Sequence, residues 1–196
     1  MKKRLLFASA NKHKIAEIRA LVEPLGYELL GLHDLSFFDD IPETGTTLRE
    51  NAYLKASFLH QKLEMPCFAD DSGLEVEALH GAPGVHSARY AGEPRNDLNN
   101  LNKLLHALAG ESKRKACFKT VICLINEQGE THYFEGRVDG EIITEARGQG
   151  GFGYDPVFVP EGYQLTFAEL PAEVKNQISH RALAVQGLLT QLQGRQ

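Results

Sequence analysis

The feature of this sequence that most constrains its fold is a short apolar run ending in two adjacent carboxylates, residues 66–74, Pro-Cys-Phe-Ala-Asp-Asp-Ser-Gly-Leu. Its length, with the flanking breakers Pro66 and Gly73, is typical of a buried strand. We expect the strand to end at Asp70 and Asp71, because an α/β sheet places its chemistry beyond the carboxyl ends of its strands. Successive strand side chains point to opposite faces, so the two carboxylates cannot share one environment. The alternative for Asp-Asp-Ser-Gly is an ordinary surface turn.

The composition is that of a globular protein with a core of ordinary size. The chain has 196 residues, of which 42% are hydrophobic and 24% charged, enough for one large domain. The net charge of −5 argues against general nucleic-acid binding, which requires a basic surface. The three cysteines lie in apolar runs, as buried thiols in a reducing compartment do. The N-terminal apolar run is too short for a signal peptide or a membrane span, so we expect a cytoplasmic location and no membrane contact.

The hydrophobic periodicity predicts both strands and helices, distributed along the whole chain. We expect one domain over residues 1–196, built as two lobes, with the hairpin of residues 115–143 in the second lobe. The strands are expected at residues 4–9, 27–30, 66–71, 74–79, 115–126, 129–143 and 157–159, and the helices at 11–25, 52–63, 96–108 and from about 173 onward.

The first predicted helix begins with an unusual concentration of positive charge, at Lys12, His13 and Lys14. Each cation in the first turn of a helix is unfavourable by about 0.3–1 kcal/mol, because that turn is the positive end of the helix dipole. An anion bound there would explain the pattern, with Ser9, Asn11 and Lys14 forming a phosphate cradle at a strand-to-helix junction. The alternative is a solvated, lysine-rich helix start.

Two charged residues, Glu43 before the second predicted helix and Lys55 within it, have no evident structural task. Thr47 and Glu50 fit a capping box, which explains Glu50. Glu43, in the loop before the helix, has no such explanation. Lys55 lies within an apolar stripe of the helix, where a lysine either extends to solvent or points toward the same anion as Lys14.

A glycine-rich segment, residues 148–156, surrounds two aromatic residues. The glycines would let the backbone approach a planar ligand while Phe152 or Tyr154 stacks on it. The alternative is a turn whose aromatic residues pack into the core. Farther along, Ser179 fits an N-cap, and the adjacent His180 and Arg181 suggest an oxygen-rich ligand nearby.

These motifs, in this order, resemble the bacterial type of the inosine triphosphate pyrophosphatase family. The resemblance extends over nearly the whole chain and rests on Ser9-x-Asn11-x-x-Lys14, Glu43-Thr44-Gly45, Glu50-Asn51-Ala52 with Lys55, Ala69-Asp70-Asp71-Ser72-Gly73-Leu74, Ser87-Ala88-Arg89-Tyr90, Gly151-Phe152-Gly153-Tyr154-Asp155-Pro156 and Ser179-His180-Arg181. It implies an α/β fold with an elongated central mixed sheet flanked by helices, two lobes around a nucleotide-binding cleft, and a homodimer. The implied reaction is Mg²⁺-dependent hydrolysis of ITP, dITP or XTP to the monophosphate and pyrophosphate.

The resemblance also assigns roles to individual residues. Mg²⁺ would be bound by Glu43 and Asp71, with Asp70 as a possible outer neighbour, and Asp71 would also be the base that activates water. The remaining residues would bind the nucleotide: Ser9, Asn11, Lys14, Lys55 and Ser72 its phosphates or sugar, and Phe152, Gly153, Tyr154, Asp155, Lys175, His180 and Arg181 its base.

The chemistry of these residue types agrees with that reaction. Carboxylate oxygens suit Mg²⁺, and attack at phosphorus requires charge neutralisation more than a covalent nucleophile. Donors on Arg181, and on His180 when protonated, match the carbonyl that hypoxanthine carries where adenine has an amino group. The alternatives are a related pyrophosphatase of modified pyrimidine nucleotides, a nucleotide sensor without turnover and, disfavoured by the acidic charge, a nucleic-acid-binding module.

Overall fold

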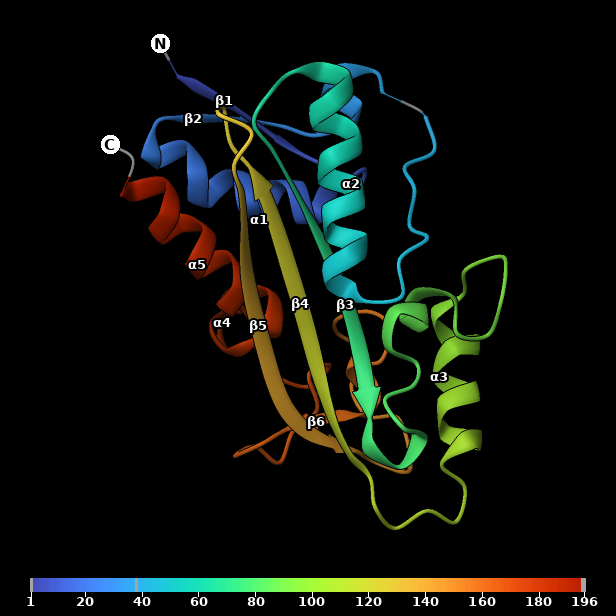
Figure 1. Ribbon diagram of the computed structural model, residues 1–196. Helices are drawn as coiled ribbons and strands as arrows, with labels where there is room; N and C mark the ends of the chain where they lie inside the picture. Colours follow the sequence, from blue (N-terminus) through green and yellow to red (C-terminus); the bar gives the residue numbers. More distant parts are fainter. Residues whose placement is uncertain (1, 38, 195–196) are drawn as a thin grey trace. The chain divides into compact units, whose positions relative to one another are not determined.

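The computed structural model describes residues 2–37 and 39–194, and of residues 13 and 17 the backbone only. Strands and helices alternate from β1 to β4, after which three strands and then two helices follow one another (Figure 1). The elements are β1 (Lys3–Phe7), α1 (Lys12–Val22), β2 (Tyr27–Leu30), α2 (Leu48–Leu63), β3 (Cys67–Val76), α3 (Asp97–Ala107), β4 (Lys115–Ile125), β5 (Thr131–Ile142), β6 (Phe158–Pro160), α4 (Ala172–Ile178) and α5 (His180–Gln193), with short 3₁₀ segments between several of them.

The strands form one mixed sheet in the order β2-β1-β3-β4-β5-β6. β1 pairs in parallel with β2, and also with β3, where Leu6 lies opposite Cys67 and Phe7 opposite Phe68. β5 and β6 pair antiparallel. The expected α/β class with a central mixed sheet is therefore confirmed.

The chain groups into two compact units. Unit 1 comprises Met1–Asp71, Val121–Glu135 and Ala184–Gln196, and unit 2 comprises Ser72–Thr120 and Gly136–Leu183. The hairpin that we expected in a second lobe contributes residues 121–135 to unit 1 and the rest of its length to unit 2. Asp71 is the last residue of its segment of unit 1, and Ser72 is the first of unit 2.

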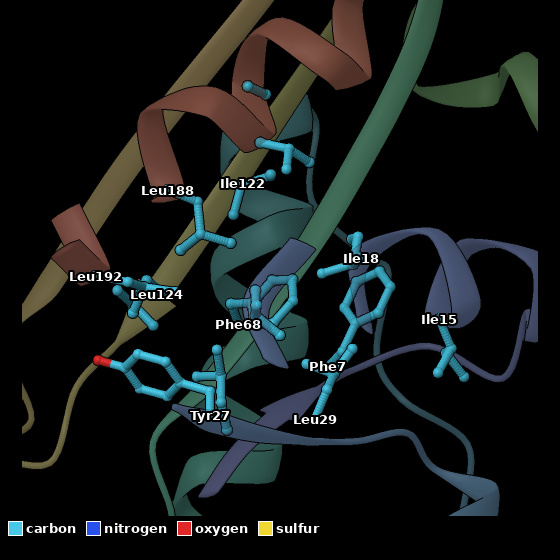
Figure 2. Packing of buried hydrophobic residues seen from close by; sticks show 14 residues of the cluster. Phe7, Ile15, Ile18, Tyr27, Leu29, Phe68, Ile122, Leu124, Leu188 and Leu192 are labelled. Atoms are coloured by element: carbon cyan, nitrogen blue, oxygen red, sulfur yellow. The ribbon is translucent and has the colours of Figure 1, made fainter. Parts of the chain in front are cut away.

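The core of unit 1 lies between the sheet and two helices, α1 and α5 (Figure 2). Helical spacing puts apolar residues of both helices on the face that meets the strands. Phe7 and Phe68 stack at the centre of this core, with ring centroids 4.6 Å apart. The buried members are Leu5, Phe7, Ile15, Ile18, Val22, Tyr27, Leu29, Phe68, Ile122, Leu124, Ala184, Val185, Leu188 and Leu192.

The core of unit 2 forms where α3 packs on the strand segments of that unit. Phe118 contacts two further rings, with centroids 4.7 Å from that of Phe158 and 6.0 Å from that of Phe167. The buried members are Leu74, Val76, Leu101, Leu104, Leu108, Ala116, Phe118, Ile142, Tyr154, Val157, Phe158 and Phe167.

Three expected boundaries were wrong. The strand does not end at Asp70 and Asp71: β3 continues through them to Val76 and so includes the first half of the separate strand expected at 74–79, of which Glu77–Leu79 form a 3₁₀ turn. α2 begins at Leu48, four residues before the expected start, because the capping box of Thr47 and Glu50 forms there. The last helix is divided into α4 and α5, since the backbone of Ser179 is extended (ψ 151°) and its hydroxyl then caps α5.

Within the part of the chain that the structure describes, none of the helices combines the length and the apolar character needed to cross a membrane.

Candidate active site

Two adjacent carboxylates in the middle of β3 form the centre of the site in unit 1. Lys14 of α1 donates to Asp70, with 2.8 Å between Nζ and Oδ2, and Lys55 of α2 donates to Asp71, with 2.9 Å between Nζ and Oδ1. Since neighbouring strand residues point to opposite faces, α1 and α2 serve opposite sides of β3. The expectation that the two carboxylates occupy different environments is confirmed, although they lie within the strand and not beyond its end.

Lys55 joins two of the predicted site carboxylates. Its Nζ lies 2.9 Å from Asp71 Oδ1 and 2.7 Å from Oε1 of Glu43, which belongs to the loop before α2. The side chains of Lys55 and Asp71 are 9% and 15% exposed, whereas that of Glu43 is 34% exposed. Lys55 therefore does not extend to solvent, and its position in the apolar stripe is explained by these two ion pairs.

Burial and charge act in opposite directions on this pair. Burial raises the pKa of Asp71, and the ion pair with Lys55 and a hydrogen bond from Asn51 only partly counteract it. Burial also disfavours the charged form of Lys55, but the negative charges of Asp71, Asp70 and Glu43 outweigh it, so its pKa is raised. A cation is thus held firmly between acidic groups.

Asn51 also belongs to this cluster, although it was not among the predicted site residues. Its side-chain amide lies 3.2 Å from Asp71 Oδ2 and donates to it. It precedes Lys55 by four residues, one helical turn, so the two side chains lie on one face of α2. That spacing was the available signal, and it was informative only once the start of α2 was known.

The start of α1 uses the side chains of Ser9 and Asn11 to cap the helix. The backbone N–H of Asn11 donates to Ser9 Oγ, and that of Lys14 donates to Asn11 Oδ1, both at 3.2 Å. Asn11 therefore acts as an N-cap, while Lys14 reaches Asp70. The side chain of His13, also expected in this basic turn, lies outside what the structure describes.

In unit 2, the glycine-rich loop exposes one aromatic ring and buries the other. Phe152 is 52% exposed, whereas Tyr154 is 4% exposed and its hydroxyl donates to the carbonyl of Ser87 at 2.8 Å. Of the two rings that we expected to stack on a base, only Phe152 is available. Tyr154 is a core residue, because its ring packs among the buried apolar side chains of unit 2.

Asp155 organises this loop from within. Its Oδ2 accepts the backbone N–H of Phe152 at 2.7 Å and forms an ion pair with Lys175 of α4. A Cβ on Gly151 would lie 2.1 Å from that oxygen, and Gly151 has φ +73°. Glycine at this position is therefore required both by the backbone conformation and by the close approach of the carboxylate.

The other predicted residues of unit 2 lie against aromatic rings or hydroxyls. His180 stacks on Phe118, with centroids 4.8 Å apart and planes 10° apart. Lys175 Nζ and Arg181 Cζ lie 5.1 Å and 5.7 Å from the ring centroid of Phe152, within the range of cation–π attraction. The hydroxyl of Ser72, by contrast, lies 2.7 Å from that of Thr120, which gives it a structural partner.

The residues of unit 1 fit a hard divalent cation. Among the described residues, there is no cluster of three or more His, Cys, Asp or Glu side chains suited to a metal ion. Glu43 and Asp71 nevertheless converge on one positive charge, the Lys55 ammonium. Mg²⁺ is commonly bound by one or two carboxylates together with water and substrate phosphates, so this pair satisfies the protein's share of such a site.

Comparison with known proteins extends this description to the whole chain. The model of the Ham1 family matches residues 5–191. A dITP/XTP pyrophosphatase of Porphyromonas gingivalis is 59% identical over 93% of this chain and 93% of its own, and one of Flavobacterium johnsoniae is 53% identical over 95% and 96%. The structure of the Staphylococcus aureus Ham1 protein superimposes with a TM-score of 0.93, at 42% identity, over 99% of this chain and 100% of that one. The motif-based resemblance is thereby confirmed, and the chain belongs to the Ham1 family.

Proposed function

We propose that this protein hydrolyses noncanonical purine nucleoside triphosphates, namely dITP, ITP and XTP, to the nucleoside monophosphate and pyrophosphate. The observation that carries the proposal is that relatives 45–59% identical over more than nine-tenths of this chain are named dITP/XTP pyrophosphatases. Such a reaction removes inosine- and xanthosine-type nucleotides from the pool before they enter DNA or RNA.

The start of α1 is proposed to receive the phosphates. Helix N-termini attract anions because their N–H groups and dipole are positive. Asn11 already caps this helix, and Lys14 adds a cation that Asp70 holds in place at 2.8 Å. A phosphate arriving here would meet an oriented cation, since the ion pair fixes the lysine before the substrate binds. Ser9 is proposed to assist through its hydroxyl.

Glu43 and Asp71 are proposed to hold Mg²⁺, with Asp70 as an outer neighbour of the site. When bound, the ion supplies charge neutralisation for the phosphoryl oxygens. Asp71 is proposed to accept a proton from the attacking water. Its raised pKa follows from burial, and a base whose pKa lies nearer neutrality accepts a proton more readily. Lys55 would contribute positive charge beside the same carboxylates.

The exposed loop of unit 2 is proposed to recognise the purine base. Phe152 offers an exposed ring for stacking, and Lys175 and Arg181 lie beside that ring. Donors on Arg181 and His180 would pair with the carbonyl of hypoxanthine or xanthine, and adenine's amino group would leave them unpaired. The roles of Gly153, Tyr154 and Asp155 are then to shape the loop, and Ser72 would approach the sugar or phosphates.

The test is release of pyrophosphate from dITP, XTP, GTP, ATP and dUTP in the presence of Mg²⁺. We expect turnover of dITP and XTP, and loss of that turnover in Asp71→Asn. A matched control is Asp34→Asn. Asp34 also pairs with a cation, with 2.8 Å between its Oδ2 and Nη2 of Arg19, and it accepts the backbone N–H of Gly31. It does not belong to β3, which carries the predicted site carboxylate Asp71. Turnover of dUTP alone would indicate the pyrimidine-directed relatives instead, and binding without turnover would indicate a nucleotide sensor.

Two further parts of the proposal concern the protein's surroundings. We propose a cytoplasmic location, because the substrates are nucleotides of the cellular pool, and a homodimer, because the family resemblance implies one. Light scattering coupled to gel filtration measures the second directly, and a monomeric mass of 21.7 kDa at assay concentration would contradict it.

A further inference from the structure

Asn51 occupies a position at which two segments carrying predicted metal ligands are joined. It lies in the first turns of α2, is 4% exposed, and shares the buried face of that helix with Lys55. One of these segments is the loop that includes Glu43, and the other is the part of β3 that includes Asp71.

The amide of Asn51 uses both of its ends. Its Nδ2 donates to Asp71 Oδ2 at 3.2 Å, and its Oδ1 accepts the backbone N–H of Gly45 at 2.8 Å. Asp71 therefore has one oxygen bound by Asn51 and the other bound by Lys55. Its carboxylate plane is fixed by two donors that come from one helix face.

Gly45 fits against this amide with no space to spare. A Cβ added to Gly45 would lie 2.8 Å from Asn51 Oδ1, 2.7 Å from the Cβ of Glu50 and 3.1 Å from the backbone nitrogen of Asn51. The loop is therefore pressed onto the helix at Gly45, two residues after Glu43. Any displacement of the amide would move this loop and Asp71 together.

Only a side chain of this size with both a donor and an acceptor can make the two contacts. An aspartate would still accept from Gly45, but it could not donate to Asp71 and would place another carboxylate beside it. A leucine would leave a buried N–H and a carboxylate oxygen without their partners, at about 1–3 kcal/mol each. The neutral amide would also keep its hydrogen bonds with a divalent cation bound between Asp71 and Glu43.

We propose that Asn51 is a positioning residue for the hydrolysis, one that holds the Asp71 carboxylate and the Glu43 loop in the arrangement in which they share a cation. The inference rests on the proposed function, since that function gives the two carboxylates their task. We assign Asn51 no contact with the substrate or with the reacting water. It acts through Asp71 and through Gly45.

The test compares Asn51→Asp with a control of the same chemistry, Asn126→Asp. Asn126 is 2% exposed, its Nδ2 donates to Oε2 of Glu130 at 2.7 Å, and its Oδ1 accepts the backbone N–H groups of Gln128 and Glu130 at 2.9 Å in the β4–β5 turn. Both substitutions exchange a buried amide for a carboxylate next to a carboxylate. Loss of folding stability is expected in both.

Only Asn51→Asp is expected to impair the site. We expect kcat for dITP to fall about 10- to 100-fold with little change in KM. The affinity for Mn²⁺ alone, followed by electron paramagnetic resonance of the nucleotide-free protein, is measured in Asn51→Ser, which adds no carboxylate, and is expected to fall by a similar factor. Asn126→Asp should leave both unchanged. If Asn51→Asp fails to fold, Asn51→Ser provides the same test, because serine adds no charge and is too short to reach both partners.

A swapped pair provides a second, activity-independent measurement. In Asn51→Asp combined with Asp71→Asn, the donor and acceptor exchange places, so the double variant should regain stability that Asn51→Asp loses, while remaining inactive. Equal kcat in Asn51→Asp and Asn126→Asp, wild-type Mn²⁺ affinity in Asn51→Ser, or no regain of stability in the swapped pair would overturn the inference. If the wild type releases no pyrophosphate, the proposed function fails, but the Mn²⁺ affinity and the swapped pair still decide the role of Asn51.

Discussion

Replacing Lys55 with methionine would test how much the Lys55 ammonium stabilises the folded protein by neutralising Asp71 and Glu43. Methionine retains most of the apolar stem of lysine but removes the ammonium that lies 2.9 Å from Asp71 and 2.7 Å from Glu43. Breaking a buried ion pair by removing one partner costs about 3–5 kcal/mol. We expect about 3 kcal/mol, the low end, because Glu43 is one-third exposed and Asp71 keeps its hydrogen bond from Asn51.

The measurement is the free energy of unfolding in urea, followed by far-UV circular dichroism because the chain has no tryptophan. Lys62→Met is the matched control: Lys62 lies in the same helix and pairs with Asp39, but both side chains are about half exposed, and such surface pairs contribute about 0–1 kcal/mol.

Mg²⁺ should then distinguish the variant from the wild type. If Mg²⁺ binds at Glu43 and Asp71 as proposed, it would compete with the Lys55 ammonium for their oxygens in the wild type, whereas in Lys55→Met it would meet no such competitor. A ligand at 100 times its dissociation constant stabilises the folded state by about 2.7 kcal/mol, so saturating Mg²⁺ should restore most of the stability lost by Lys55→Met. Equal losses in Lys55→Met and Lys62→Met, or equal stabilisation of wild type and Lys55→Met by Mg²⁺, would refute this reasoning.

Three further outcomes are expected. Asp71→Asn should abolish pyrophosphate release from dITP and XTP while its circular dichroism spectrum stays that of the wild type; retained turnover would contradict the role given to this carboxylate. Phe152→Ala should raise KM for dITP without loss of stability, whereas Tyr154→Phe should lower the free energy of unfolding by about 1–3 kcal/mol, because a buried carbonyl loses its donor; the reverse pattern would contradict the different exposures of the two rings. The three cysteines should react with a thiol reagent at pH 8 only after denaturation. Burial raises the pKa of each thiol, that of Cys123 to about 12, and so leaves little reactive thiolate. Fast reaction of the native protein would contradict this.

The sequence predicted the kinds of elements better than their boundaries. The presence of most helices and strands, the capping box at Thr47 and the opposite environments of Asp70 and Asp71 all follow from local spacing. The continuation of β3 past Asp71 does not, because Asp-Asp-Ser-Gly has the composition of a turn. It stays extended because long-range partners satisfy its polar side chains: Lys14, Lys55 and Thr120.

The same limit applies to the candidate site. Motif spacing identified Lys55 and Glu43 as residues without an ordinary structural task, but not that they bind each other. Likewise, the glycine-rich loop predicted an exposed aromatic ring, but sequence alone could not assign exposure to Phe152 and burial to Tyr154. Those outcomes depend on which side chain fills the core of unit 2 and on the hydroxyl contact with Ser87, 67 positions away in the chain.

The placement of Asp70 and Asp71 in mid-strand has a consequence for insertions and deletions. A single residue added or removed between Cys67 and Asp70 would turn each carboxylate to the other face of the sheet, so that each would face the wrong helix and the wrong lysine. Two added residues would restore the faces but displace the carboxylates by about 6.6 Å along the strand, farther than Lys14 or Lys55 could follow. The length of this segment should therefore be invariant among functional homologues, even at positions where its apolar residues are exchanged for one another.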